Sequence, residues 1–163
     1  MCSSKEALRR AAPPDVRALE DLERRSFSGD RLSRRSWRRL IDSPSAIVTI
    51  ASGSQQQPLA ASVLLFRSTA SVARLYSIAV DAAARGRGLG QRVLQRCVDD
   101  ARAYGCDRLR LETRADNHAA QRLFRGLGFR EFARKPSYYE DGQAAWRFEK
   151  SLLRAGSPCR IRT

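Results

Sequence analysis

The sequence predicts an α/β (α+β) fold in which helices cover both faces of one mixed sheet. Strand-like and helix-like segments alternate from Ala7 to Leu153, in the order strand, two helices, three strands, helix, strand, helix, two strands. A glycine-rich run also joins a strand to a helix in the middle of the chain. Since no internal repeat or long linker divides the 163 residues, we expect one domain over 1–154 and a flexible tail over 155–163.

The N-terminal half is expected to contain one strand, two helices and two further strands. A strand over Ala7–Ala12 ends at two prolines, and the helix that follows takes Asp15 as its cap. A second short helix over Ser33–Ile41 presents apolar residues on one side and ends at an Asp-Ser-Pro break. Strands over Ala46–Ser52 and Leu59–Arg67 then flank a polar turn.

The C-terminal half carries the strongest periodic patterns. Apolar residues recur at helical spacing from Leu89 onward, and Gly105 then provides a stop signal. In the next segment two leucines alternate with Arg110 and Glu112, which indicates a strand with one buried face. Asn117 can cap the helix after it. The strands expected in this half are Val72–Val80, Arg108–Thr113, Phe129–Arg134 and Ala144–Leu152.

A glycine-rich segment connects the strand ending at Val80 to the long helix. It consists of Arg85, Gly86, Arg87, Gly88, Leu89 and Gly90. Alternate glycines leave the backbone uncovered, so successive N–H groups can turn toward one point, where the dipole of the following helix favours an anion. Guanidinium groups also match phosphate oxygens in a planar, two-pronged way. The segment therefore predicts a phosphate-binding loop.

Two common phosphate-binding motifs do not fit this segment. A Walker loop requires Lys followed by Ser or Thr at the helix start, whereas Gly90 is followed by Gln91 and Arg92. A dinucleotide fingerprint has the spacing G-x-G-x-x-G at the first strand of the fold, whereas the glycines here follow G-x-G-x-G in mid-chain. From the residues alone, the glycines could also serve only to turn the chain and begin the helix.

Composition limits the other function classes. The net charge of +14 is nearly all arginine spread over every segment, without an aromatic-and-basic sheet signature or a recognition helix. We therefore expect no dedicated DNA binding, while attraction to ribosomal RNA is compatible with the charge.

Four scattered cysteines and one histidine predict neither a zinc cage nor a disulfide framework. No apolar run approaches the roughly 18 residues of a membrane span, so we expect a soluble cytoplasmic protein without membrane partners.

Three stretches resemble the GNAT superfamily of N-acetyltransferases. Arg85-x-x-Gly88-x-Gly90, after a strand ending in Ile-Ala-Val, is similar to the acetyl-CoA pyrophosphate loop of that superfamily. The stretches 111–117 and 123–129 are similar to the second half of RimI-like protein N-terminal acetyltransferases, and the Tyr-Tyr pair followed by Asp-Gly over 138–142 resembles their last interstrand loop. The resemblance implies a single GNAT-like domain with a mixed central sheet of about seven strands.

The resemblance also implies acetyl-CoA as co-substrate and no metal. The backbone of the 85–90 segment would hold the pyrophosphate. The main chain of the preceding strand would bond the pantetheine arm through Ile78, Ala79 and Val80. Asn117 would reach the pantetheine as well, although a helix cap explains an asparagine at this position equally well.

For the acceptor, the resemblance implies the α-amino group of a protein or peptide N-terminus, which attacks acetyl-CoA directly in a ternary complex. Glu112 would be the general base, acting through water. By pattern alone, this residue is a solvated glutamate paired with Arg110 or Arg114. Tyr138 and Tyr139 would bind the acceptor backbone, whereas loop packing is the simpler explanation from the residues alone.

One position departs from the family pattern. Phe124 stands where a tyrosine usually protonates the leaving CoA thiolate, in a position expected to line the cofactor site. Phenylalanine cannot donate a proton, but a CoA thiolate resembles a cysteine thiolate with a pKa of about 8.5 and can leave unprotonated. Tyr138 or Tyr139 could supply the proton instead, and we therefore count Tyr139 with Glu112 as a candidate catalytic residue.

Other functions are also compatible with the sequence. A small-amine acetyltransferase, acting on polyamines or amino acids, would use the same chemistry. A non-catalytic acyl-CoA-binding or ribosome-binding module would account for Phe124 and the +14 charge. Either a monomer or a homodimer is compatible with the sequence.

Overall fold

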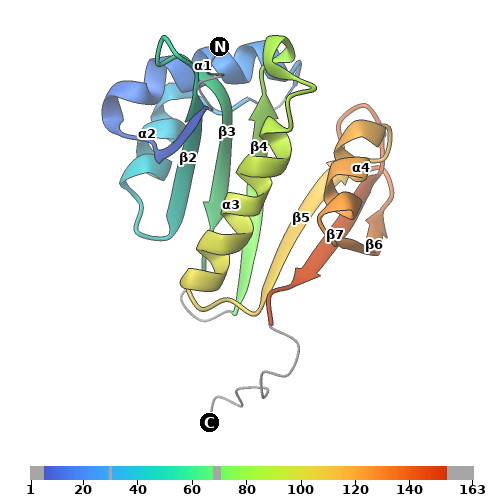
Figure 1. The fold of residues 1–163 in the computed structure, drawn as a ribbon. Helices are drawn as coiled ribbons and strands as arrows, with labels where there is room; N and C mark the ends of the chain where they lie inside the picture. The colour runs from blue at the N-terminus through green and yellow to red at the C-terminus, as the bar shows by residue number, and fades with distance from the viewer. Residues whose placement is uncertain (1–5, 30, 68–70, 154–163) are drawn as a thin grey trace.

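The computed structural model describes residues 6–29, 31–67 and 71–153. They form a seven-stranded mixed sheet with strand order β1-β2-β3-β4-β5-β7-β6 (Figure 1). The strands are β1 (Ala7–Arg10), β2 (Ala46–Ser52), β3 (Pro58–Leu65), β4 (Val72–Val80), β5 (Arg108–Arg114), β6 (Arg130–Lys135) and β7 (Ala145–Ser151). The helices are α1 (Val16–Ser26), α2 (Arg34–Asp42), α3 (Leu89–Ala103) and α4 (His118–Gly126), with 3-10 turns η1 (Pro13–Asp15) and η2 (Ala82–Ala84). The predicted tail over 155–163 lies outside the described residues.

The order of elements predicted from the sequence is confirmed, and Asp15 is the N-cap residue of α1 as predicted, but in the described chain its side chain makes no capping hydrogen bond. Its carboxylate accepts instead from the Ala12 N–H at 2.7 Å and pairs with the Arg9 guanidinium at 2.7 Å. The carboxylate therefore closes the η1 turn, because an arginine on β1 offers a stronger, charged partner on that side.

Helices cover both faces of the sheet, as predicted. Helices α3 and α4 lie on one face, whereas α1 and α2 lie on the other, beside β2 and β3 (Figure 1). A core cluster under α3 and α4 contains the fully buried Leu94, Leu109 and Phe148. A second cluster joins Trp37 of α2 to Ile50 of β2. Within the described ranges, no helix is long and apolar enough to cross a membrane.

A β-bulge in β4 changes which face its side chains occupy. In the antiparallel register with β3, Ser77 is opposite Val63 and Leu75 is opposite Leu64, so Tyr76 is an extra residue. Before the bulge, Leu75 belongs to the α3 side of the core. After it, Ala79 packs in the core under α1 and α2. One inserted residue thus reverses the alternation of the last part of the strand.

Strand β4 separates from β5 at this bulge. Strands β4 and β5 form the sheet's parallel pair, and their register runs from Val72 with Arg108 to Leu75 with Leu111. Beyond that last pair the two ribbons diverge toward their C-terminal ends (Figure 1). The end of β4 and the end of β5 therefore each carry a backbone edge that the other strand does not pair.

We expect Phe148→Ala to lower the free energy of unfolding by about 3–5 kcal/mol, because it removes a buried aromatic ring from a packed core. Phe148 is 0% exposed, and its ring centroid lies 5.8 Å from that of Phe124. Urea unfolding followed by circular dichroism measures the loss. Leu153→Ala is the control, because Leu153 is 47% exposed and its loss should change stability by less than about 0.5 kcal/mol. A Phe148→Ala loss as small as that of the control would contradict this packing.

Candidate functional site

The glycine-rich segment 85–90 forms the turn into α3. Gly86 and Gly88 have φ angles of 82° and 73°, in the left-handed region that a β-carbon disfavours. Gly88 is the N-cap of α3, and the Arg92 N–H donates to its carbonyl at 3.1 Å to begin the helical hydrogen bonds. The N–H groups of residues 89–91 precede that bond, at the positive end of the helix dipole. The turn is therefore suited to bind a phosphate.

A third glycine allows the first turn of α3 to lie close to its neighbours. A β-carbon on Gly90 would stand 3.4 Å from Leu123 and 3.5 Å from Val80. The start of α3 therefore packs against both the end of β4 and helix α4. This packing fixes where the N–H groups of the turn point.

The arginines around the turn differ in their contacts. Arg87 lies 3.7 Å from the Glu6 carboxylate and donates to the Ala83 carbonyl at 3.4 Å. Arg92 binds the same carboxylate at 3.0 Å and donates to the Glu6 carbonyl at 2.6 Å. Arg85 is exposed at the start of the turn. Glu6 thus holds two of the cations, while Arg85 faces solvent.

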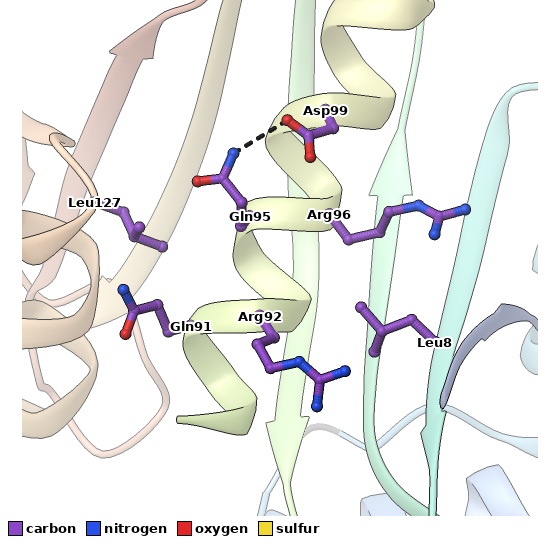
Figure 2. Close-up of a pocket in the computed structure, with 7 residues that line it drawn as sticks. All are labelled: Leu8, Gln91, Arg92, Gln95, Arg96, Asp99 and Leu127. Carbon is purple, nitrogen blue, oxygen red and sulfur yellow. Dashed lines mark hydrogen bonds between the residues drawn. The ribbon is translucent and has the colours of Figure 1, made fainter. Parts of the chain in front are cut away.

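Two shallow hollows border the N-terminal part of α3. The first, of about 370 Å³, is lined by Leu8, Gln91, Arg92, Gln95, Arg96, Asp99 and Leu127 (Figure 2). The second, of about 390 Å³, is lined by Glu6, Gly53, Ser54, Gln57, Leu59, Ala83, Ala84 and Arg87. In Figure 2, Gln91 of α3 faces Leu127, which follows α4, and Gln95 bonds Asp99 at 3.1 Å. Arg87 of the 85–90 turn lines the second hollow, whereas Gln91, directly after the turn, lines the first; neither is lined by Glu112.

Glu112 lies on the face of β5 opposite Leu109 and Leu111, as the alternation predicts. Its side chain is only 11% exposed. Three cations surround the carboxylate, at 3.5 Å for Arg74 Nη2, 3.5 Å for Lys135 Nζ and 3.1 Å for Arg147 Nε. They come from three different strands.

The partners expected for Glu112 from the sequence are wrong. Arg110 binds Glu149 at 2.6 Å, and Arg114 binds Asp116 at 3.0 Å. Glu149 lies directly opposite Arg110 in the β5–β7 register, and cross-strand neighbours on one face lie close together. Asp116 follows Arg114 by two residues, just beyond the end of β5.

Opposing effects set the pKa of Glu112. Burial raises the pKa, but a hydrogen bond from Tyr138 and the charges of the three cations outweigh it, so the pKa lies below the ordinary value of 4.5. The group is therefore a carboxylate at neutral pH. The same hydrogen bond, together with burial, raises the pKa of Tyr138.

The loop between β6 and β7 brings the predicted tyrosine pair to this carboxylate. The N–H groups of Tyr138 and Tyr139 both donate to the Gln143 carbonyl, at 3.0 and 3.1 Å. The Arg114 guanidinium lies 5.0 Å from the centre of the Tyr139 ring and also binds Asp141. The end of β5 thus holds the loop in place. Burial and the charge of Glu112 raise the pKa of Tyr139, which keeps its hydroxyl protonated at neutral pH.

Two predicted cofactor residues have structural roles. The Asn117 side chain accepts a hydrogen bond from the Ala120 N–H at 3.1 Å, so it caps α4 as predicted. Phe124 is 3% exposed and packs against Phe129 and Phe148 in the core. Neither contact tests the cofactor contacts predicted for these residues, which stay predictions.

The structure joins the predicted residues into two groups. One contains Glu112, Tyr138 and Tyr139, at the end of β5 and in the loop before β7. The other contains the 85–90 turn and the last residues of β4, Ile78, Ala79 and Val80, which continue directly toward that turn. The two groups flank the region where β4 and β5 part.

Sequence reasoning missed Arg74, Lys135 and Arg147 around Glu112. Arg147 lies directly opposite Glu112 in the antiparallel β5–β7 register. That pairing follows only from the order of strands in space, since the sequence carries no local signal for it. Within the described ranges, no cluster of three or more His, Cys, Asp or Glu side chains is placed to hold a metal ion.

Among curated proteins, the chain is similar to enzymes named as N-acetyltransferases of a ribosomal protein. Over 71 residues, the chain is 41% identical to the ribosomal protein bS18-alanine N-acetyltransferase of Salmonella typhimurium, a match that covers 44% of this chain and 48% of that enzyme. The enzyme of the same name from Escherichia coli K12 is 40% identical over 67 residues, which are 41% of this chain and 45% of that one. The chain therefore spans about half the length of the curated relatives it matches.

Solved structures share the whole fold. The crystal structure of the ribosomal-protein-S18-alanine N-acetyltransferase from Escherichia coli matches with a TM-score of 0.83 over 96% of this chain and 99% of that chain, at 24% identity. Residues 16–129, which are well over half of the chain, match the family model described as the acetyltransferase (GNAT) family. Because that match covers more than half of the chain, the chain belongs to the acetyltransferase (GNAT) family.

Proposed function

We propose that this protein transfers an acetyl group from acetyl-CoA to the α-amino group of a protein or peptide N-terminus. The observation that carries the proposal is the Glu112 carboxylate, held among three cations at the point where β4 and β5 part. The relatives named for acetylation of a ribosomal protein support this choice of acceptor. A ribosomal protein in the cytoplasm is accordingly a candidate acceptor.

The cofactor would lie along β4 and end at the turn into α3. The N–H groups of the 85–90 turn and the exposed Arg85 would hold the pyrophosphate. The unpaired edge of residues 78–80 offers alternating N–H and C=O groups to the amide-containing pantetheine arm, as a neighbouring strand would. Asn117 lies at the start of α4, where the free donors of its side chain can serve the same arm while the oxygen caps the helix. A related fold, yncA from Salmonella typhimurium, was solved with its cofactor acetyl-CoA, with a TM-score of 0.80 over 97% of this chain and 100% of that chain at 20% identity.

The charges around Glu112 would favour the reactive form of the acceptor. A protonated amine cannot attack a thioester, so the α-ammonium must lose a proton first. Three cations near Glu112 disfavour the ammonium relative to the neutral amine. The carboxylate then accepts the proton through a water molecule. Because its own pKa is low, Glu112 would pass this proton on to solvent.

Transfer would proceed in one ternary complex. The neutral amine nitrogen attacks the thioester carbonyl carbon, and a C–N bond forms while the carbonyl oxygen becomes an oxyanion. Collapse of this intermediate breaks the C–S bond, and the nitrogen loses its remaining extra proton to water or Glu112. The products are the acetylated N-terminus and CoA.

The leaving thiolate would take a proton from Tyr139, and the tyrosinate would regain one from solvent. The pKa of Tyr139 is raised, so its hydroxyl carries a proton at neutral pH, and unlike Tyr138 it is not hydrogen-bonded to Glu112 in the described structure. Phe124, in the core beneath α4, supplies no proton. A thiolate with a pKa of about 8.5 can also leave without one, so Tyr139 would assist the step without being indispensable.

A small-amine acetyltransferase is the second candidate within this chemistry. The three cations around Glu112 disfavour it, because a polyamine would bring several further positive charges to the same place. Incubation of the protein with acetyl-CoA and a library of short peptides, followed by mass spectrometry, tests the choice. Acetylation of peptide α-amines supports the proposal, whereas turnover of polyamines or free amino acids alone would reject it.

We expect Glu112→Gln to lower kcat by about 10²–10⁴-fold, because the amide cannot accept a proton from the acceptor. Steady-state kinetics measure the change with a library peptide whose free α-amine the wild type acetylates. Calorimetry should find that the affinity for acetyl-CoA is retained. Glu131→Gln is the matched control, since Glu131 pairs with Arg125 at 3.5 Å on the other face of the sheet. A fall in kcat no larger than that of the control would favour a non-catalytic binding module.

We expect Tyr138→Phe to raise the pKa of Glu112, because it removes the hydrogen bond to the carboxylate. A carboxyl with a lowered folded pKa stabilises the fold at pH values above its unfolded pKa, and this contribution is lost as the pH falls through the folded pKa. In the wild type that loss therefore occurs below the ordinary value of 4.5. Carboxyl ¹³C NMR titration of both proteins measures the pKa, and an unchanged or lower value in Tyr138→Phe would contradict the assigned hydrogen bond.

We expect Gly88→Ala to weaken acetyl-CoA binding by about 10-fold or more, because a β-carbon at a positive φ costs roughly 1–2 kcal/mol and displaces the N–H groups of the turn. Gly88 has a φ of 73° and open space around it, so strain is the expected cause. Isothermal titration calorimetry measures the affinity. Gly126→Ala, a helical glycine with no atom within 4 Å of the added carbon, should bind acetyl-CoA as the wild type does. If both variants bind acetyl-CoA with equal affinity, the 85–90 turn is not part of the cofactor site.

A further inference from the structure

The β5–β7–β6 half of the sheet carries an exposed, arginine-rich face on the same side as Glu112. Helices α1 and α2 cover the β2 and β3 part of that side (Figure 1). The strand registers place the following cations together on the remainder, which we call the basic face: Arg74, Arg108, Arg110, Arg130, Lys135 and Arg147. Among the residues of β5 and β7 on this face, the carboxylates are Glu112 and Glu149. The face therefore carries a clear excess of positive charge.

Exposed aromatic rings hold these cations in fixed positions. Phe132, which is 42% exposed, lies in the bulge of β6, and the guanidinium carbons of Arg110 and Arg147 each stand 5.0 Å from its ring centre. Lys135 Nζ lies 5.1 Å from the centre of the Tyr138 ring. Guanidinium groups that already rest against a ring lose less side-chain entropy when they bind an anion. The basic face is thus organised to bind carboxylates or phosphates.

The basic face is continuous with the proposed acceptor site. Glu112 contacts Arg74, Lys135 and Arg147, which belong to both. Arg110 lies two residues from Glu112 along β5, which corresponds to roughly 7 Å. An extended peptide advances about 3.3 Å per residue, so a chain with its first residue at Glu112 reaches Arg110 with its third.

We infer that the basic face binds acidic residues at about positions 3 to 6 of the acceptor, so that the preferred acceptors are N-termini followed by Asp and Glu. This inference rests on the proposed function. Continuity with the Glu112 site favours an acceptor segment over RNA as the occupant. The ring of Phe132 is also engaged by two guanidinium groups, which leaves it poorly placed to stack on a base.

Three peptides that share their first two residues and differ at positions 3–6 (all Glu, all Gln or all Lys) test the preference. We expect kcat/KM to be at least about 10-fold higher for the Glu peptide than for the Lys peptide, mainly through KM, with a strong dependence on salt. Arg110→Gln should reduce this ratio by about 3-fold. Arg38→Gln removes the same charge from α2, away from the basic face, and should leave the ratio unchanged.

Fluorescence anisotropy of labelled, N-acetylated versions of the peptides tests the basic face without turnover. Tighter binding of the Glu peptide to the wild type than to Arg110→Gln supports the inference even if no peptide is acetylated, a result that would reject the proposed function alone. Equal kcat/KM for the Glu and Lys peptides overturns the inference while the acetyltransferase assignment stands. Binding of a labelled oligouridylate that is lost in Arg110→Gln, with no preference among peptides, would also overturn it and assign the face to RNA.

Discussion

The separation of β4 from β5 is the constraint on which the other features of the site depend. The bulge at Tyr76 reverses the alternation of β4, and the pairing with β5 ends at Leu75 and Leu111. Past that point, the N–H and C=O groups on both edges need partners from water or a ligand. An extended, amide-containing ligand satisfies such an edge as a strand would. Because β4 continues toward the 85–90 turn, such a ligand can place its phosphate end at the N-terminus of α3.

Electrostatics on the other side of this opening suit a neutral amine. In a chain with a net charge of +14, Glu112 is held among three cations and stays ionised. Two effects follow from one cluster. In the proposed reaction, the carboxylate would accept a proton, and the surrounding positive charge would oppose an incoming ammonium. A polar loop, fixed by Arg114 through Asp141 and the Tyr139 ring, encloses the same carboxylate.

The sequence allowed the fold to be predicted because the signals for its elements are local. Helical spacing marks α3, and alternate glycines mark a turn that requires the positive φ found at Gly86 and Gly88. Interactions across strands carry no such signal. The cations around Glu112 come from three strands, and the bulge at Tyr76 depends on how β3 and β4 align. The sequence likewise showed no aromatic-and-basic sheet signature, because Phe132 and its two arginines lie on three different strands.

Under the proposed function, the two cysteines in the described ranges, Cys97 and Cys106, favour direct transfer over an acetylated enzyme. The 85–90 turn starts α3, on one face of the sheet, whereas Glu112 lies on the other face. Under the proposed function, donor and acceptor would therefore meet where β4 and β5 part. An acyl-enzyme route would need an accessible thiolate. Burial raises the pKa of Cys97 to about 12, and its thiol donates to Ser62 at 3.2 Å inside the core. Burial also raises the pKa of Cys106. Neither of these two thiols suits an acyl carrier, so the proposed reaction would pass the acetyl group directly from the thioester to the acceptor amine.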